Sequence, residues 1–149
     1  MKVTECTNRN SVAMQDMAEA TKEAGSMAAQ SGVKVNELSA LIGTAVARTK
    51  KSGNEIGTAL KALFINLQNT QNEKITGTFD KLGISMTKIV GDSEMLKTPI
   101  ELIEELSKVY NALPEGSVDK ANILTNIGGK VYLVVQKCTT RMNLIAGNV

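Results

Sequence analysis

The stretch ALIGTAVARTKKSGNEIGTALKALF, Ala40 to Phe64, decides the fold because two amphipathic segments meet in it at a Ser-Gly joint. Apolar residues on the first segment recur with the period of one helix face: Leu38, Leu41, Ile42, Ala45 and Val46. The second segment shows the same spacing: Ile56, Leu60, Leu63, Phe64 and Leu67. Because the joint is short, we expect the two helices to fold back as a hairpin with their apolar stripes in contact.

Local signals set the ends of these two helices. Asn36 is a candidate N-cap for the first helix, and Gly53 is expected to end it. Ser52 and Glu55 have the S-x-x-E spacing of a capping box, in which each side chain accepts a hydrogen bond from the backbone N–H of the other residue. The sequence therefore predicts a helix that starts immediately after the joint.

The segment before this hairpin also reads as a helix. From Ser11 to about Gln30 the apolar residues follow helical spacing, and Ser31-Gly32 supplies a stop. Its methionines leave two interpretations open, an adaptable partner surface or packing in the core, of which core packing is favoured: Met14, Met17 and Met27.

Shorter elements are expected further along the chain. A short helix carrying Phe79 should end at Gly83, and residues 85–98 read as a loop or a short strand-like connection. Thr98-Pro99-Ile100-Glu101 combines a capping box with proline at the first helical position and starts a helix that Pro114 stops. A last helix is expected over Ser117–Ile127, closed by Gly128-Gly129.

The composition agrees with an all-α fold of several short amphipathic helices, arranged as antiparallel helical hairpins in a small bundle. Aromatic residues make up only 3% of the chain, so the core must be aliphatic, which suits closely packed helices better than a sandwich or barrel. A net charge of +2 is too small to indicate nucleic-acid or membrane binding by bulk electrostatics. Cys6 and Cys138 lack metal-ligand spacing, and we expect two reduced thiols rather than a disulfide.

Nothing in the sequence points to catalytic, cofactor-binding or metal-binding residues. The chain has no histidine, which removes the commonest general base and zinc ligand. Glu104 and Glu105 are adjacent on a helix, so their carboxylates should diverge. GDSEM (91–95) lacks the repeated oxygen ligands of an EF-hand, and IGGK (127–130) lacks the spacing of a phosphate loop. We therefore expect no enzyme and no cofactor.

The order of these motifs resembles the phage tail tape measure proteins. Residues 17–67 contain in sequence an Ala-rich helix, an SGV turn, an ELSALIGTA helix and an SGNEIGTALKALF helix, as in the helical block of that family. FDKLGISM (79–86), TPIELIEELSKVYNAL (98–113) and ANILTNIGGK (121–130) continue the pattern. The pattern stops at Lys130. We therefore expect three parts: a disordered leader (1–10), a tape-measure-like helical block (11–130) and a divergent C-terminal tail (131–149).

The resemblance implies a structural role. The chain is expected to be a fragment of a tape measure protein that helps set tail length and nucleate tail-tube assembly. Its partners would be tail-tube proteins, tail assembly chaperones and other copies of itself, with no small-molecule substrate, specific nucleic acid or membrane. Its expected location is the virion tail, and the bacterial host cytoplasm during assembly. The alternative is a generic helical adaptor, although the apolar register from Ile56 to Leu67 is short for a coiled coil.

Overall fold

The computed structural model describes residues 14–129 and 132, and most of these are helical. The expected all-α class is confirmed, with one small two-stranded sheet as an addition. In chain order the elements are α2 (Met14–Ser31), α3 (Val35–Thr49), α4 (Gly53–Leu67), α5 (Glu73–Leu82), β1 (Thr87–Val90), β2 (Ser93–Leu96), α6 (Pro99–Ala112), α7 (Val118–Ile123) and a π-helical turn η1 (Leu124–Gly128).

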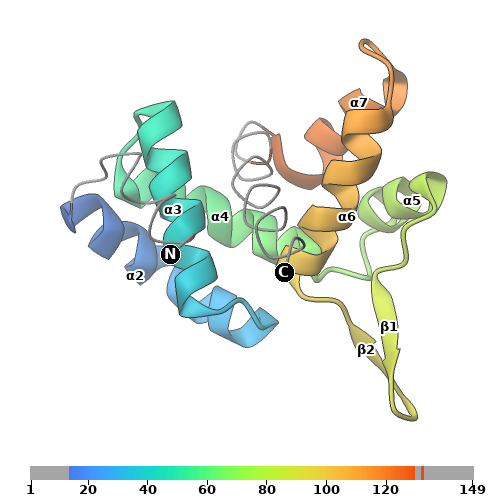
Figure 1. Ribbon diagram of the computed structural model, residues 1–149, viewed down its shortest axis with the longest axis horizontal. Helices are drawn as coiled ribbons and strands as arrows, with labels where there is room; N and C mark the ends of the chain where they lie inside the picture. Colours follow the sequence, from blue (N-terminus) through green and yellow to red (C-terminus); the bar gives the residue numbers. More distant parts are fainter. Residues whose placement is uncertain (1–13, 130–131, 133–149) are drawn as a thin grey trace, which may run out of the picture.

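Helix α4 connects the two groups of helices visible in Figure 1. It contacts α2 and α3 on one side of the molecule and α6 and η1 on the other. Its apolar stripe is fully buried, as the periodicity predicts: Ile56, Leu60, Leu63, Phe64 and Leu67. Since these residues join one continuous core with residues from α2 to η1, the described helices share a single apolar interior.

The main partner of α4 differs from the sequence prediction. The α3–α4 pair is in contact, but α4 packs far more extensively against α2. The cause is the small side chains of α2, where Ala20, Ala24 and Ala28 are completely or almost completely buried and let the two helices approach closely. Helix α3 is instead surrounded, with every residue from Ala40 to Val46 buried.

Two predicted helix boundaries are wrong. Helix α3 begins at Val35, because the Glu37 carboxylate accepts a hydrogen bond from the Lys34 backbone N–H at 2.9 Å, so Asn36 lies inside the helix rather than at its cap. The same helix ends at Thr49, where Lys50 adopts the left-handed conformation at φ 58°. Gly53 does not terminate α3 and is the first residue of α4.

Other boundaries agree with the sequence. Gly32 and Gly83 have positive φ after α2 and α5. Thr98 forms the full capping box with Glu101, as predicted. Ser52 caps α4 by accepting a hydrogen bond from the Glu55 N–H, but the predicted capping box is incomplete there, because the Glu55 carboxylate accepts from Ser52 Oγ and not from the Ser52 backbone N–H. The last predicted helix is divided into α7, capped by Ser117, and η1, after which Gly129 has φ 55°.

Residues 85–98 form a hairpin that projects from the helices (Figure 1). Strands β1 and β2 pair antiparallel, with Lys88 opposite Met95 and Val90 opposite Ser93. The two-residue turn contains Gly91 at φ 62°, a conformation that short hairpin turns require and that glycine adopts without strain. The strand-like connection expected from the sequence is thus a protruding β-hairpin.

Several predictions concern residues outside the described part of the chain. The leader (1–10), Cys6, Cys138 and the tail (131–149), Tyr132 excepted, fall there. Tyr132 itself is fully buried and belongs to the core that the helices share. No helix among the described residues is long and apolar enough to cross a membrane.

Candidate functional site

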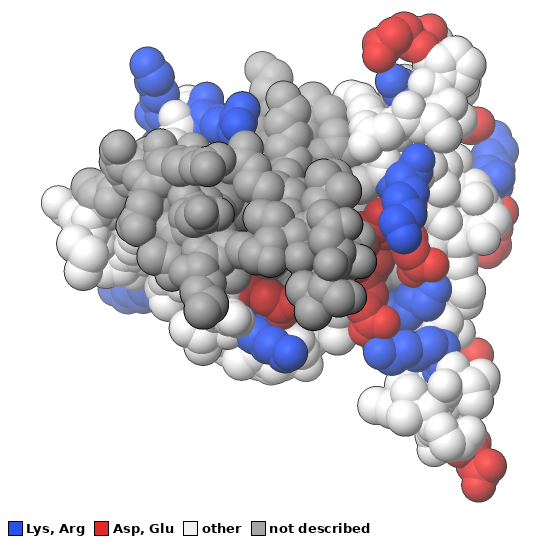
Figure 2. All heavy atoms as spheres, viewed as in Figure 1, with Lys and Arg blue, Asp and Glu red and all other residues white. Residues whose placement is uncertain are grey.

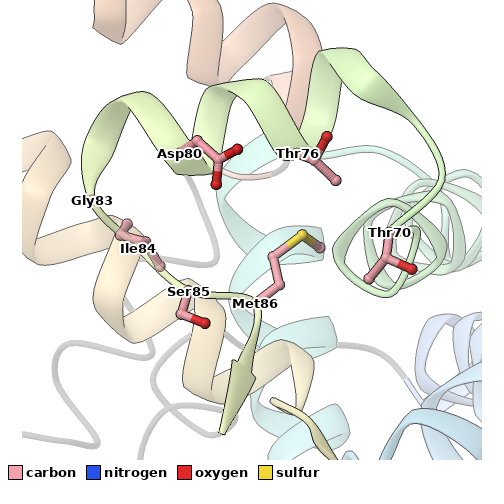
Figure 3. Close-up of a pocket in the computed structure, with 7 residues that line it drawn as sticks. All are labelled: Thr70, Thr76, Asp80, Gly83, Ile84, Ser85 and Met86. Atoms are coloured by element: carbon pink, nitrogen blue, oxygen red, sulfur yellow. The ribbon is translucent and has the colours of Figure 1, made fainter. Parts of the chain in front are cut away.

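The pockets of the described part offer little chemistry. The pocket in Figure 3 lies between α5 and the start of β1, and Asp80 is the one acidic or basic side chain among its lining residues: Thr70, Thr76, Asp80, Gly83, Ile84, Ser85 and Met86. A second pocket, between α4 and η1, is lined by uncharged residues that include Asn66 and Thr125. Among the described residues no three His, Cys, Asp or Glu side chains gather as a metal site would require.

The acidic residues weighed in the sequence also stay apart. Glu105 pairs with Lys97, at 2.7 Å between Oε2 and Nζ. Burial raises the pKa of the Glu104 carboxyl, an effect that Lys108 opposes. Residues of the GDSEM segment form the turn and second strand of the hairpin rather than a cation-binding loop. Within the described ranges, these side chains therefore serve helix and hairpin structure.

The most distinctive geometry is the crossing of α2 and α4. A Cβ atom at Gly53 would lie 2.1 Å from the Asp16 carbonyl oxygen, and one at Gly57 would lie 2.7 Å from the Ala20 carbonyl oxygen. Both contacts are with backbone, so neither glycine tolerates a side chain without moving a helix. The SGNEIG motif is thus explained by packing, with Gly53 and Gly57 one turn apart on the face that meets α2.

A hydrogen bond fixes the position of this crossing. Asp16 Oδ1 accepts from the Gly53 backbone N–H at 3.0 Å, so a carboxylate of α2 caps the first turn of α4. Ser52 caps the same helix end through the Glu55 N–H at 3.2 Å. A negative charge at a helix N-terminus is favourable because unpaired N–H groups and the helix dipole meet there. The sequence analysis did not single out Asp16, because its partner lies 37 residues away.

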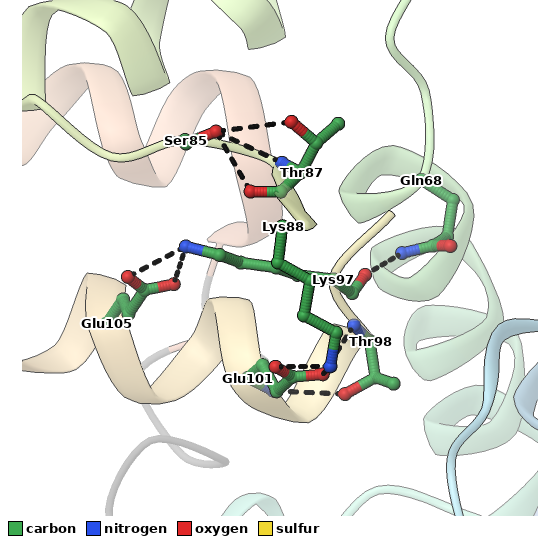
Figure 4. A network of polar contacts seen from close by, with 8 residues as sticks. All are labelled: Gln68, Ser85, Thr87, Lys88, Lys97, Thr98, Glu101 and Glu105. Carbon is green, nitrogen blue, oxygen red and sulfur yellow. Dashed lines mark hydrogen bonds and ion pairs between the residues drawn. The ribbon is translucent and has the colours of Figure 1, made fainter. Parts of the chain in front are cut away.

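The base of the hairpin is attached to α6 by charged side chains (Figure 4). Lys88 Nζ contacts both carboxylate oxygens of Glu101, at 2.7 and 2.9 Å, and Lys97 reaches Glu105 in the same way. Gln68 Nε2 donates to the Lys97 carbonyl oxygen at 2.8 Å, which adds a contact from the residue that follows α4. Burial alone would raise the pKa of Glu101, but Lys88 and the Thr98 contacts lower it.

Beyond this base, the hairpin exposes apolar side chains. Half of the large hydrophobic residues that are exposed in the described part lie on its two strands: Ile89, Val90, Met95 and Leu96. In Figure 2 the hairpin is mostly uncharged along its length and acidic at its tip, with lysines near its base. Exposed apolar clusters of this kind commonly mark protein-interaction surfaces. The sequence analysis expected a connection here and missed this surface.

The α2 methionines divide between the two interpretations. Met17 and Met27 are partly buried and pack against the core, as favoured from the sequence. Met14, at the start of the described chain, is 85% exposed. The helix is therefore held mainly by its alanines, and its methionines add contacts at the edge.

At the other end of the molecule, Tyr132 packs edge-on against Tyr110, with ring centroids 5.9 Å apart. Lys120 lies on α7, and its Nζ is 4.8 Å from the centroid of the Tyr110 ring on α6. The Tyr132 hydroxyl is buried and has no well-directed hydrogen bond among the described residues. Burial raises the pKa of the Tyr132 hydroxyl, and the nearby Ser107 side chain partly offsets this increase. These contacts join α6, α7 and Tyr132 into the core.

Among the described residues, the exposed apolar hairpin is the feature that is typical of a protein-interaction surface. A family model described as phage-related minor tail protein matches residues 2–129. The chain belongs to this family, which gives it a structural role in a phage tail. No solved structure matches the chain.

Proposed function

We propose that the chain acts as the helical block of a tail tape measure protein, which helps set tail length and nucleates tail-tube assembly. The observation that carries the proposal is the family match over residues 2–129, combined with the order of helical motifs that resembles tape measure proteins. The partners in this proposal are tail-tube proteins and tail assembly chaperones, which the block meets in the host cytoplasm before it enters the virion tail.

The described fold suggests how such a block would contribute. An α-helix advances about 1.5 Å per residue, so an extended helical protein can relate its residue number to a length. The described helices fold back on one another and share one core, so they are a folded unit rather than part of an extended rod. A folded unit at one place on a ruler can serve as an attachment point, from which tube subunits begin to polymerise.

Binding and polymerisation assays test this proposal. Purified tail-tube protein from the same phage is followed by light scattering, with and without the chain. A nucleating block should shorten the lag before tube growth and should bind the tube protein or the chaperone in pull-down experiments. The Gly77→Ala variant serves as a positive control and should shorten the lag as the wild-type chain does, because the added Cβ meets no atom within 4 Å and leaves the fold unchanged.

The same assays distinguish the proposed function from the alternative, a generic helical adaptor. A generic helical adaptor would leave the lag unchanged and bind neither tail protein. That outcome would refute the proposed role in tube assembly while leaving the helical fold intact.

A further inference from the structure

The β2 edge of the two-stranded sheet has backbone groups without a partner among the described residues, whereas on the β1 edge Ser85 Oγ forms hydrogen bonds with both the N–H and the carbonyl oxygen of Thr87. In an antiparallel ladder, hydrogen-bonded pairs alternate with pairs whose N–H and C=O groups point outward. The Lys97 N–H donates to the Met86 carbonyl oxygen at 2.9 Å, which fixes the alternation. From the observed register, Glu94 and Leu96 then direct their backbone groups out of the free edge of β2.

The hairpin also has the character of an incomplete sheet. Two strands alone are marginally stable in water, and a third or fourth strand would cover apolar side chains that are now exposed. On β2, Met95 is 49% exposed and Leu96 is 41% exposed. The ion pairs of Lys88 and Lys97 hold the base on α6, so the hairpin is already positioned for a partner strand.

We propose that β2 pairs antiparallel with β2 of a second copy of this chain, forming a four-stranded sheet across a two-fold axis. The alternation of backbone groups allows several registers, and we favour the one in which Glu94 of each copy lies opposite Leu96 of the other, with Met95 opposite Met95 at the axis. This register uses both outward-facing residues of each β2 strand and keeps the two Glu94 side chains from lying directly opposite each other. Ser93 then lies opposite Lys97. An apolar pair at the centre and hydrogen bonds on both sides make this register self-complementary.

Charge favours the β2 edge over the β1 edge. Antiparallel pairing of two β1 edges in the equivalent central register, with Thr87 opposite Ile89, would place Lys88 opposite Lys88, and like charges directly opposite are destabilising. On β2 the charged residue is Glu94, whose Oε2 accepts a hydrogen bond from Thr87 Oγ1 at 3.0 Å. This contact draws the carboxylate across the hairpin toward β1 and leaves the β2 edge open.

The antiparallel arrangement also matches acid with base. The strand register places Asp92 in the turn, Glu94 close to it, and Lys88 and Lys97 nearer the base of each hairpin. Figure 2 shows the same distribution, with acidic atoms at the tip and basic atoms near the base. Pairing through β2 brings the tip of each copy beside the base of the other. The contribution is small because Glu101 and Glu105 already compensate both lysines, so the backbone ladder and the apolar pair carry the interaction.

Proline substitutions test the edge that is used. The Leu96→Pro variant removes an outward N–H from β2, and Ile89→Pro is the matched control because it removes an outward N–H from β1. By sedimentation equilibrium, the wild-type chain should dimerise. Leu96→Pro should raise the dissociation constant about thirtyfold, since it removes one ladder hydrogen bond in each direction. Ile89→Pro should leave the dissociation constant unchanged.

Disulfide trapping tests the register. In a background with Cys6→Ser and Cys138→Ser, the Met95→Cys variant should form a covalent dimer on mild oxidation. Opposed residues at the axis are about 4.5 Å apart between Cα atoms, within disulfide reach. The control Ser93→Cys should not crosslink, because the two copies of that residue are separated along the strands.

Several outcomes would overturn the proposal. These are a wild-type chain that is monomeric at all concentrations, equal weakening by both proline variants, or crosslinking through Ser93→Cys instead of Met95→Cys. A monomer whose β2 edge is nevertheless protected from hydrogen exchange by a tail protein would assign the edge to that partner instead. The proposal is independent of tail-length control, so a dimer that fails to nucleate tubes would refute only the proposed function.

Discussion

Substitution of Gly57 by alanine tests the helix crossing on which the described fold depends. The new Cβ would lie 2.7 Å from both the Ala20 carbonyl oxygen and the Glu23 Cβ, and 2.8 Å from the Ala20 Cα. Two of these atoms are backbone and cannot rotate away, so α2 and α4 must separate or shift.

Two opposing effects determine the magnitude. Overpacking of a well-packed interface costs about 1–3 kcal/mol, whereas replacing glycine by alanine inside a helix gains up to about 1 kcal/mol of intrinsic propensity. We therefore expect Gly57→Ala to lower the free energy of unfolding by about 1–2 kcal/mol. For a domain of this size that corresponds to a decrease in Tm of about 2–8 °C.

Gly77 provides the matched control, because it lies inside α5 and a Cβ there would meet no atom within 4 Å. Gly77→Ala gains the propensity without the clash and should raise the free energy of unfolding by about 0.5–1 kcal/mol. Urea denaturation followed by circular dichroism at 222 nm measures both variants. The close crossing of α2 and α4 would be refuted if Gly57→Ala stabilised the chain as much as Gly77→Ala does.

Three further predictions concern α6 and its neighbours. Thr98→Ala removes the capping box and should cost about 1 kcal/mol in urea denaturation, whereas Thr98→Ser should be close to wild type. Tyr132→Phe removes a buried hydroxyl that has no well-directed hydrogen bond among the described residues and should stabilise the chain by about 1 kcal/mol. The pKa of Glu101 is lowered in the fold, so the stability from its ion pair with Lys88 is fully present above about pH 4.5, the ordinary value for the carboxyl, and is lost as the pH falls from there through the lowered pKa. Thermal melts from pH 6 to pH 3 should therefore show a steeper loss for wild type than for Glu101→Gln.

Each of these predictions can fail in a specific way. Equal stability of Thr98→Ala and wild type would mean that proline at the first helical position suffices to start α6. Destabilisation by Tyr132→Phe would show that the hydroxyl forms a stabilising hydrogen bond, for which Ser107 is the neighbouring side chain. Parallel pH profiles for wild type and Glu101→Gln would remove any role for Lys88 in fixing the hairpin on α6.

Periodicity and local capping made the helices predictable from the sequence. Thr98 and Ser52 act through backbone groups within three residues, so short motifs suffice to locate them. The stripe on α4 was also predictable because its spacing depends only on helix geometry.

The choice of partners was not predictable in the same way. Alanines on α2 give a weak hydrophobic signal, yet their small size makes α2 rather than α3 the main partner of α4. The boundary at Gly53 was misassigned because glycine is equally suited to end a helix and to permit close packing. The exposed hairpin was missed because its strands have only four residues each, too few for a clear alternation.

Tail length in electron micrographs tests the proposed function most directly. In the phage that encodes this chain, a stop codon at Lys22 would remove the helical block, and a plasmid copy of the intact reading frame would restore it. We expect the interrupted phage to lack tails or to form tails of variable length, with a single length returning on complementation. Tails of uniform wild-type length from the interrupted phage would contradict a role in length control.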